Sequence, residues 1–450
     1  MADPYILKDA QIIDVENGRV YTGSIYIAGG VIEALYDVDE ELPGDIEAIT
    51  LKGQFVMPGL IDMHCHINEG IAPQFVASGV TTVRNTAGNV LDLKKMIEAP
   101  ADAPTPRIYS ADRMIDGPPG LWGPSSSGNF VTDSPAEARK EVRRQVTEGA
   151  DFIKVYGWLS KEVMEAVVEE ADLHGRKVSC DLLHSREVNA LDAAKLGVTW
   201  FEHASGFLQV LHPEWYPLAE EEVRNQINWA EPDEEKIKKL CEEMIQYGVK
   251  LCPTLVLSDQ IMQYPDYWDP KNAITESVRG EDRLGGHWEN LSQHNETLRN
   301  QTGLILEFTK KVARTYYELG GTVVTGTDTP AGIWGFPGMA LHRELELFVE
   351  VGFSEMEALQ AATSKAAAAI DMTDRGVIKK GAVADLVVLS NNPLDDIRNT
   401  KNIVNVIKGG RIYSEAELLS HVPDFSKLEK EYEEFDRKFM EGLAATEAQN

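Results

Sequence analysis

The middle of the chain alternates short β-rich runs with amphipathic helical stretches, and this alternation constrains the fold more than any other feature. The stretch SKEVMEAVVEEADLHG, for example, places Val163, Met164, Val167 and Val168 at helical spacing. Eight strands that alternate with helices predict an α/β fold, the (β/α)8 TIM barrel. The eight runs are residues 56–63, 79–84, 107–111, 152–156, 177–183, 199–202, 249–256 and 322–327.

Both ends of the chain have a different texture. The first 55 residues contain short apolar runs separated by turn signals such as Asn17-Gly18 and Gly29-Gly30. Similar runs return near the C-terminus in GVIKKGAVADLVVLS and IVNVIKGGRIYS. We therefore expect both termini to build one small β-sandwich domain. The predicted division is 1–56 and 376–415 for the two parts of the sandwich, 57–375 for the catalytic barrel and 416–450 for a helical tail.

Two segments are too long to be plain connections. Residues 205–236 and 258–300 are rich in Trp, Tyr, Pro and charge. They are predicted to form loops or helical lids over the barrel mouth, where insertions shape substrate pockets. The tail FSKLEKEYEEFDRKFMEGL has helical spacing and is predicted to serve as a packing or oligomer arm, so a homo-oligomer is expected.

Composition limits the class of partner. The 450 residues include 43 bases and 73 acids, a formal charge of -30. Nucleic acid and anionic membranes are bound chiefly through Lys and Arg, so we expect neither and predict a small-molecule substrate. The four cysteines form no CxxC pair, which argues against a disulfide scaffold or a structural zinc knuckle. The start MADPYILKDAQ and the lack of a long apolar run predict a soluble, cytoplasmic protein.

Polar residues gather where the predicted strands end. His64 and His66 end the first strand, and alternation along a strand points both imidazoles to the same side. Lys154 lies inside the apolar run FIKVYG, where an unpaired ammonium is costly to bury. Active sites of TIM barrels lie at the C-terminal ends of the strands, so these residues are expected to share one site. The other strand-end residues are His184 in DLLHS, His203 in FEHAS and Asp328 in VTGTDTP.

Each of these residues also has an ordinary structural interpretation. A single strand-end histidine is often only hydrogen-bonded, a buried lysine often pairs with an acid, and Thr-Asp is a common helix start. Six such residues at predicted strand ends, in the order HxH, Lys, His, His, Asp, are hard to explain separately. Together they favour a metal site.

The chain closely resembles the amidohydrolase superfamily, in its imidazolonepropionase-like and prolidase-like branch. The resemblance covers nearly the whole length and rests on MPGLIDMHCH, GVTTVRNTAG, GADFIKVY, AAKLGVTWFEHA, LCPTLVL, VVTGTDTP and the terminal GVIKKGAVADLVVLSNNPL.

This resemblance implies a binuclear centre of two divalent ions. His64, His66 and Asp328 would hold one ion, and His184 and His203 the other. Lys154, carboxylated by CO2, would bridge both. Mixed imidazole and oxygen ligands favour zinc.

The implied reaction is hydrolysis of a C–N amide bond by a metal-bridging hydroxide. Asp328 would be the catalytic residue that passes the proton to the leaving nitrogen. An acyl-amino acid, a dipeptide and a cyclic amide all remain candidate substrates.

Two positions depart from the family pattern, and three other residues are candidates for binding substrate. Asn85 stands where relatives often have Asp, and strand 177–183 runs longer before His184 than is usual. Tyr156 and Trp158 on predicted mouth loops are expected to bind substrate, as is His342 after the last strand, although aromatic residues at a barrel rim are often plain packing.

Two other functions compete with amide hydrolysis. A deaminase of an aminated heterocycle is suggested by His184-x-x-Glu187, but Lys154 argues against it because such enzymes usually lack a carboxylated lysine. A binding protein that has lost its metals is disfavoured because all six ligand positions are present.

Overall fold

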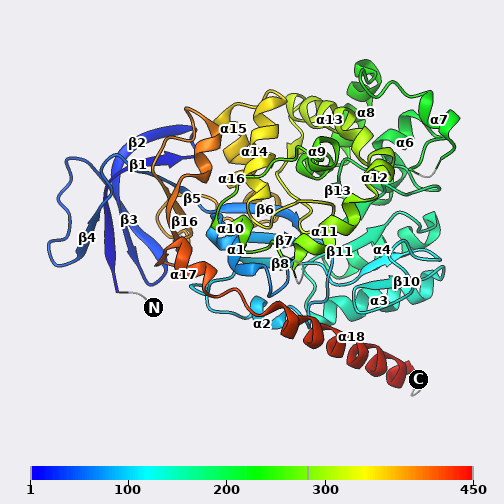
Figure 1. The fold of residues 1–450 in the computed structure, drawn as a ribbon, viewed down its shortest axis with the longest axis horizontal. Helices are drawn as coiled ribbons and strands as arrows, with labels where there is room; N and C mark the ends of the chain where they lie inside the picture. The colour runs from blue at the N-terminus through cyan, green and yellow to red at the C-terminus, as the bar shows by residue number, and fades with distance from the viewer. Residues whose placement is uncertain (1–2, 218, 281–282, 448–450) are drawn as a thin grey trace.

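The computed structural model describes residues 3–217, 219–280 and 283–447. Figure 1 shows a sheet built from both ends of the chain, next to a larger body of strands surrounded by helices. Within these residues, every helix is too short or too polar to cross a bilayer.

The larger body contains the eight parallel strands that the sequence predicts. Six pairings join neighbouring strands, and two isolated bridges, Ala111 to Phe152 and Cys65 to Thr329, close them into a barrel-like ring. The TIM-barrel prediction is therefore confirmed. The strands are β6 (Leu60–Cys65), β7 (Val80–Asn85), β8 (Arg107–Ser110), β11 (Ile153–Tyr156), β12 (Val178–Asp181), β13 (Trp200–Glu202), β14 (Lys250–Cys252) and β15 (Thr322–Val323).

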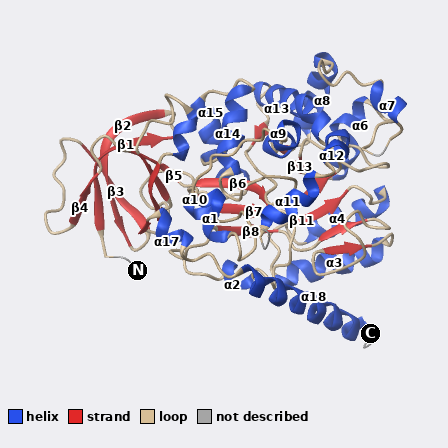
Figure 2. Ribbon diagram, in the orientation of Figure 1, coloured by secondary structure: helices blue, strands red, loops and turns tan. Residues whose placement is uncertain are grey.

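Helices cover the outside of the barrel (Figure 2). In α4 the four predicted apolar positions, Val163, Met164, Val167 and Val168, are buried, as an amphipathic helix requires. Ser134 and Ser160 accept backbone N–H groups at the starts of α3 and α4. The covering helices are α1 (Ala72–Ala77), α2 (Lys94–Ile97), α3 (Pro135–Glu148), α4 (Lys161–Leu173), α5 (Ala190–Leu196), α8 (Glu234–Gln246), α13 (Leu306–Glu318), α14 (Ala340–Glu350), α15 (Glu355–Ala361) and α16 (Ser364–Ala369).

The terminal sheet joins strands from both ends of the chain. Its order is β18-β17-β16-β5-β1-β2-β3, with β4 beside β1, and β5 pairs with β16 where the two ends meet. Gly18 and Gly29 have left-handed backbones at the predicted hairpin turns. A hydrophobic cluster of its own fills this part. Its strands are β1 (Tyr5–Asp14), β2 (Arg19–Ala28), β3 (Val31–Asp37), β4 (Glu47–Thr50), β5 (Phe55–Pro58), β16 (Leu386–Leu389), β17 (Ile403–Lys408) and β18 (Arg411–Tyr413).

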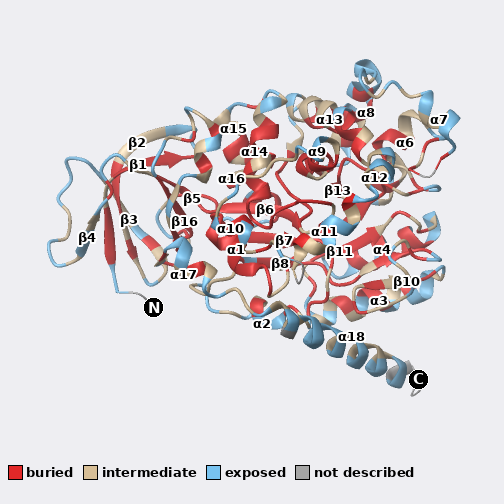
Figure 3. Ribbon diagram, viewed as in Figure 1, coloured by how far each residue is buried: buried red, intermediate tan, exposed pale blue. Residues whose placement is uncertain are grey.

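Short helices separated by loops make up the two long inserted segments, and the tail is helical. The tail forms α18 (Phe425–Glu447), which runs along the outside and is largely exposed (Figure 3). The remaining elements are β9 (Met114–Asp116), β10 (Asn129–Val131), α6 (Phe207–Leu211), α7 (Glu221–Asn225), α9 (Leu255–Gln263), α10 (Ala273–Glu276), α11 (Leu284–Ser292), α12 (Asn295–Gln301), α17 (Glu415–Leu419) and the 3-10 helices η1 (Gly303–Ile305) and η2 (Ile397–Lys401).

Three strand boundaries differ from the sequence prediction. The run 56–63 is divided, since β5 pairs with β1 and β16 in the terminal sheet while β6 enters the barrel. The run 249–256 stops at Cys252 because α9 begins at Leu255. The run 177–183 stops at Asp181, which affects the site directly. The predicted domain limits stay predictions.

Gly326 tests how tightly the barrel interior is packed. A Cβ at this position would overlap Cys252 Sγ and lie 2.9 Å from the backbone N of His64. We expect Gly326→Ala to destabilise the fold by roughly 1–3 kcal/mol through overpacking. The control is Gly44→Ala, since a Cβ there meets nothing within 4 Å. Thermal unfolding should show a lower midpoint for the first variant alone, and equal midpoints would contradict this packing.

Candidate metal centre

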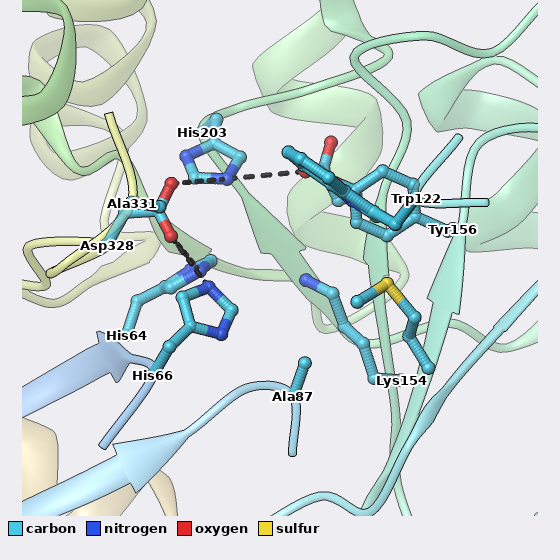
Figure 4. A pocket seen from close by; sticks show the side chains of 11 residues that line it. His64, His66, Ala87, Trp122, Lys154, Tyr156, His203, Asp328 and Ala331 are labelled. Atoms are coloured by element: carbon cyan, nitrogen blue, oxygen red, sulfur yellow. Dashed lines mark hydrogen bonds and ion pairs between the residues drawn. The ribbon is translucent and has the colours of Figure 1, made fainter. Parts of the chain in front are cut away.

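The strand ends meet around one cavity of about 220 Å³. Figure 4 shows His64, His66 and His203 converging on Asp328, with the amino group of Lys154 directed toward them. Five of the six predicted metal ligands therefore lie together. The lining consists of His64, His66, Ala87, Met114, Trp122, Lys154, Tyr156, Asp181, His203, Asp328 and Ala331.

Asp328 is the point where the histidines meet. Its Oδ1 lies 3.1 Å from His64 Nε2 and 2.9 Å from His66 Nε2, and its Oδ2 lies 3.7 Å from His203 Nε2. Burial alone would raise the pKa of Asp328, but the three imidazoles outweigh burial and hold that pKa well below its usual range. Asp328 is therefore a carboxylate at neutral pH.

His203 is oriented by a neighbour behind it. Its Nδ1 contacts the hydroxyl of Thr254 at 2.5 Å, which leaves Nε2 facing the cavity, 3.4 Å from Asp181 Oδ2. Ligand atoms of His64, His203 and Asp328 all lie within 4.8 Å of one another. Imidazole nitrogens and carboxylate oxygens are the usual ligands of divalent metal ions, so this group is a candidate metal site.

Lys154 is buried, and within the described residues its Nζ has no hydrogen-bond partner. A lone ammonium in such a place is unfavourable unless something in the cavity offsets its burial. The orphaned nitrogen beside three imidazoles and two carboxylates fits a lysine that becomes a metal ligand.

A buried ion pair below the cavity holds His64. Glu202 Oε2 lies 2.7 Å from His64 Nδ1, and Glu202 Oε1 accepts from Arg84 Nη1 at 2.8 Å. The Arg84 guanidinium lies 4.3 Å from the ring centroids of both Phe152 and Trp200. Burial would raise the pKa of Glu202, but Arg84, Lys154 and His64 hold it well below its usual range. Glu202 therefore keeps the proton on His64 Nδ1 and leaves Nε2 free for the cavity.

Glu202 is a residue of the site that the sequence pattern does not predict. Strand alternation would put Glu202 and His203 on opposite sides of β13. His203 instead has a left-handed backbone, with φ 59°, so both side chains reach the barrel interior. Thr254 and Asp328 also have positive φ, at 47° and 58°. Backbone strain of this kind collects at functional sites.

His184 is not brought to the cavity. β12 ends at Asp181, and His184 lies three residues later on a half-buried loop, outside the lining. Asp181 takes the strand-end position instead. Burial would raise the pKa of Asp181, but His203 and Lys154 lower that pKa, so this acid is ionised.

Of the three predicted substrate-binding residues, one lines the cavity and two do not. Tyr156 lines the cavity together with Trp122. Trp158 does not, because its indole N–H donates to the carbonyl of His184 at 3.1 Å. His342 is buried elsewhere, with Nδ1 2.9 Å from Thr400 Oγ1 and Nε2 3.0 Å from the carbonyl of Ser78. Burial lowers the pKa of His342 to about 3, so this residue is a neutral structural histidine.

The fold and this site agree with a known protein family. The family model described as "Amidohydrolase family" matches residues 55–413, from β5 to β18. The chain belongs to the amidohydrolase family. Its sheet at the termini and its barrel are thus the architecture of an amidohydrolase.

Individual amidohydrolase relatives are distant. An ochratoxinase from Aspergillus niger is 25% identical over 370 residues, which are 77% of this chain and 62% of that protein. The chain therefore spans less than two thirds of the length of this curated relative. An adenine deaminase from Desulfatibacillum aliphaticivorans is 28% identical over 122 residues, which are 24% of this chain and 21% of the deaminase. Among solved structures, a protein assigned as a prolidase from Bifidobacterium longum has a TM-score of 0.68 and 25% identity, covering 93% of this chain and 99% of its own.

Glu202→Gln tests the support of His64. An amide cannot neutralise Arg84 and also accept from His64 Nδ1, so metal affinity should fall by roughly 10–100-fold. The matched control is Glu141→Gln, which breaks the buried pair with Arg113 outside the cavity. Both variants should melt earlier, and only the first should bind Zn²⁺ more weakly in calorimetric titration. Unchanged affinity in Glu202→Gln would show that Glu202 is structural only.

Proposed function

We propose that this amidohydrolase is a metal-dependent hydrolase that cleaves a C–N amide bond. The observation that carries the proposal is the buried, partnerless amino group of Lys154 in a cavity lined by three imidazoles and two carboxylates. Two of the similar proteins are named as an ochratoxinase and a prolidase, and both names describe enzymes that hydrolyse amide bonds. The long match to the ochratoxinase and the short match to the adenine deaminase favour this reaction over deamination.

Lys154 would enter the centre as a carbamate. Its neutral amine adds to CO2 and loses a proton, which replaces a buried cation by an anionic oxygen ligand. His64, His66 and Asp328 would hold one divalent ion, and the carbamate and His203 would contribute to a second. Zinc suits these ligands. When bound, such ions supply Lewis acidity and a water of lowered pKa.

The chain's own residues handle the proton. Asp328 is ionised, and its Oδ2 is less engaged than Oδ1, which faces two imidazoles. Oδ2 is therefore the atom that accepts a proton from the attacking water and returns it to the leaving nitrogen. Trp122, Tyr156 and Met114 give the cavity an apolar wall.

A deaminase is the second candidate, and one position argues against it. Glu187, the residue of the His184-x-x-Glu187 pattern that would shuttle protons, is exposed and lies outside the cavity lining. A cytoplasmic location and a homo-oligomeric state stay predictions from the sequence.

Lys154→Ala tests the carbamate. Since a direct ligand is lost, activity should fall by about 100-fold or more, and a short carboxylic acid supplied in trans should restore part of it. Lys161→Ala is the control, because Lys161 is exposed and pairs only at the surface with Asp192. Normal activity in Lys154→Ala, measured on a substrate that the wild type cleaves, would contradict the proposal.

The charges of the cavity predict which amides are cleaved. Its described lining contains two acids, Asp181 and Asp328, and no arginine, and Lys154 is its only ammonium. If Lys154 is a carbamate that binds the metal ions, the described lining offers no ammonium or guanidinium side chain to pair with a free carboxylate beside the scissile bond. We expect N-acyl amino acid amides to be hydrolysed about 10-fold faster than the corresponding free acids, because like charges disfavour binding.

The substrate panel therefore pairs each N-acyl amino acid and dipeptide with its C-terminal amide, and adds cyclic ureides and aminopurines. Faster turnover of the free acids would contradict the charge argument. Release of ammonia from an aminopurine, with no amide cleaved, would favour the deaminase.

A further inference from the structure

We infer that Asp181, and not His184, is the ligand that β12 supplies to the metal centre. The inference rests on the proposed metal-dependent function and specifies its second metal site. That site would then consist of one imidazole and two anionic oxygen groups, from His203, Asp181 and the carbamate of Lys154.

Asp181 has the position and orientation of a ligand. It is the last residue of β12 and lies opposite Tyr156 in the register of β11 and β12, two residues beyond the pair of Lys154 and Ser179. Strand alternation therefore puts Asp181 and Lys154 on the same side of the sheet, and both line the cavity. Asp181 is 3% exposed.

The two carboxylate oxygens of Asp181 have different surroundings. Oδ1 accepts from the backbone N–H of Leu183 at 2.9 Å, which fixes the plane of the carboxylate. Oδ2 lies 3.4 Å from His203 Nε2, the same nitrogen that faces Asp328. Oδ2 and His203 Nε2 thus present two donor atoms to the same part of the cavity.

The loop that contains His184 is held away from the cavity. Leu182 N donates to Ser205 Oγ at 2.7 Å, and Gln209 Nε2 donates to the carbonyl of Leu182 at 2.8 Å. On the other side, a Cβ added to Gly157 would lie 2.8 Å from Ser185 N, so the two backbones are in close contact.

Because residues 182–185 are fixed on both sides, His184 would reach the cavity only if this loop moved. Asp181 needs no such movement.

A carboxylate from Asp181 in place of an imidazole from His184 would change which metal ion the second site prefers. An anionic oxygen ligand adds one negative charge and suits Mn²⁺ better than a nitrogen ligand does. The second site should therefore accept Mn²⁺ readily as well as Zn²⁺, and Asp181→His should shift it toward Zn²⁺.

The test counts metal by plasma mass spectrometry after equilibration with Zn²⁺ or Mn²⁺ alone and removal of free ion. The wild type and His184→Asn should hold about two ions per chain, and Asp181→Asn about one. Asp181→His should regain the second ion in Zn²⁺ but not in Mn²⁺. This last variant separates loss of a ligand from loss of the fold, since a misfolded chain regains nothing.

Two results would overturn the inference. If Asp181→Asn keeps both ions while His184→Asn loses one, His184 is the ligand. If Asp181→His holds no more Zn²⁺ than Asp181→Asn, the position does not ligate. A wild type that binds no ion with either metal would instead contradict the proposed function itself, so the two failures are distinguishable.

Discussion

The burial of Lys154 is the constraint on which the site depends. An ammonium group removed from water without a partner is unfavourable, and here it faces the interior of a barrel end. The proposed conversion to a carbamate, with metal bound, would remove this penalty and would account for the gathering of Asp181, Asp328 and three imidazoles around one small cavity. Folding and metal binding would then be coupled, because the fold brings these groups together and the ions would offset the repulsion between the carboxylates and the carbamate.

Rigid groups behind the cavity give the ligands their directions. Glu202 joins Arg84 to His64, and Thr254 contacts His203, so each of these imidazoles has one nitrogen engaged and the other directed inward. Breaking a buried pair such as Arg84 and Glu202 by removing one partner would leave an uncompensated charge. The arrangement therefore favours a single orientation of His64, but substitutions of Arg84 or Glu202 are expected to be poorly tolerated.

Much of this site could be predicted from the sequence. His64 and His66 follow from strand alternation, and Lys154 and Asp328 from their places at strand ends. Asp181 could not, because a single acid after Ser179 and Cys180 is an ordinary residue, and the strand predicted over 177–183 placed His184 at its end instead. Glu202 could not be predicted either, because His203 has a left-handed backbone and the regular alternation of side chains along β13 ends there. His342 was close in sequence to the barrel mouth, but α14 directs it toward Ser78 and Thr400.

The most direct measurement of the central claim is a ¹³C NMR spectrum of the protein equilibrated with ¹³C-bicarbonate and a diamagnetic divalent metal. A lysine carbamate held between metal ligands should give one carbonyl resonance that persists after free bicarbonate is removed and is absent from Lys154→Ala. A wild type without such a resonance, or a variant that keeps it, would contradict the assignment of Lys154 as a metal ligand.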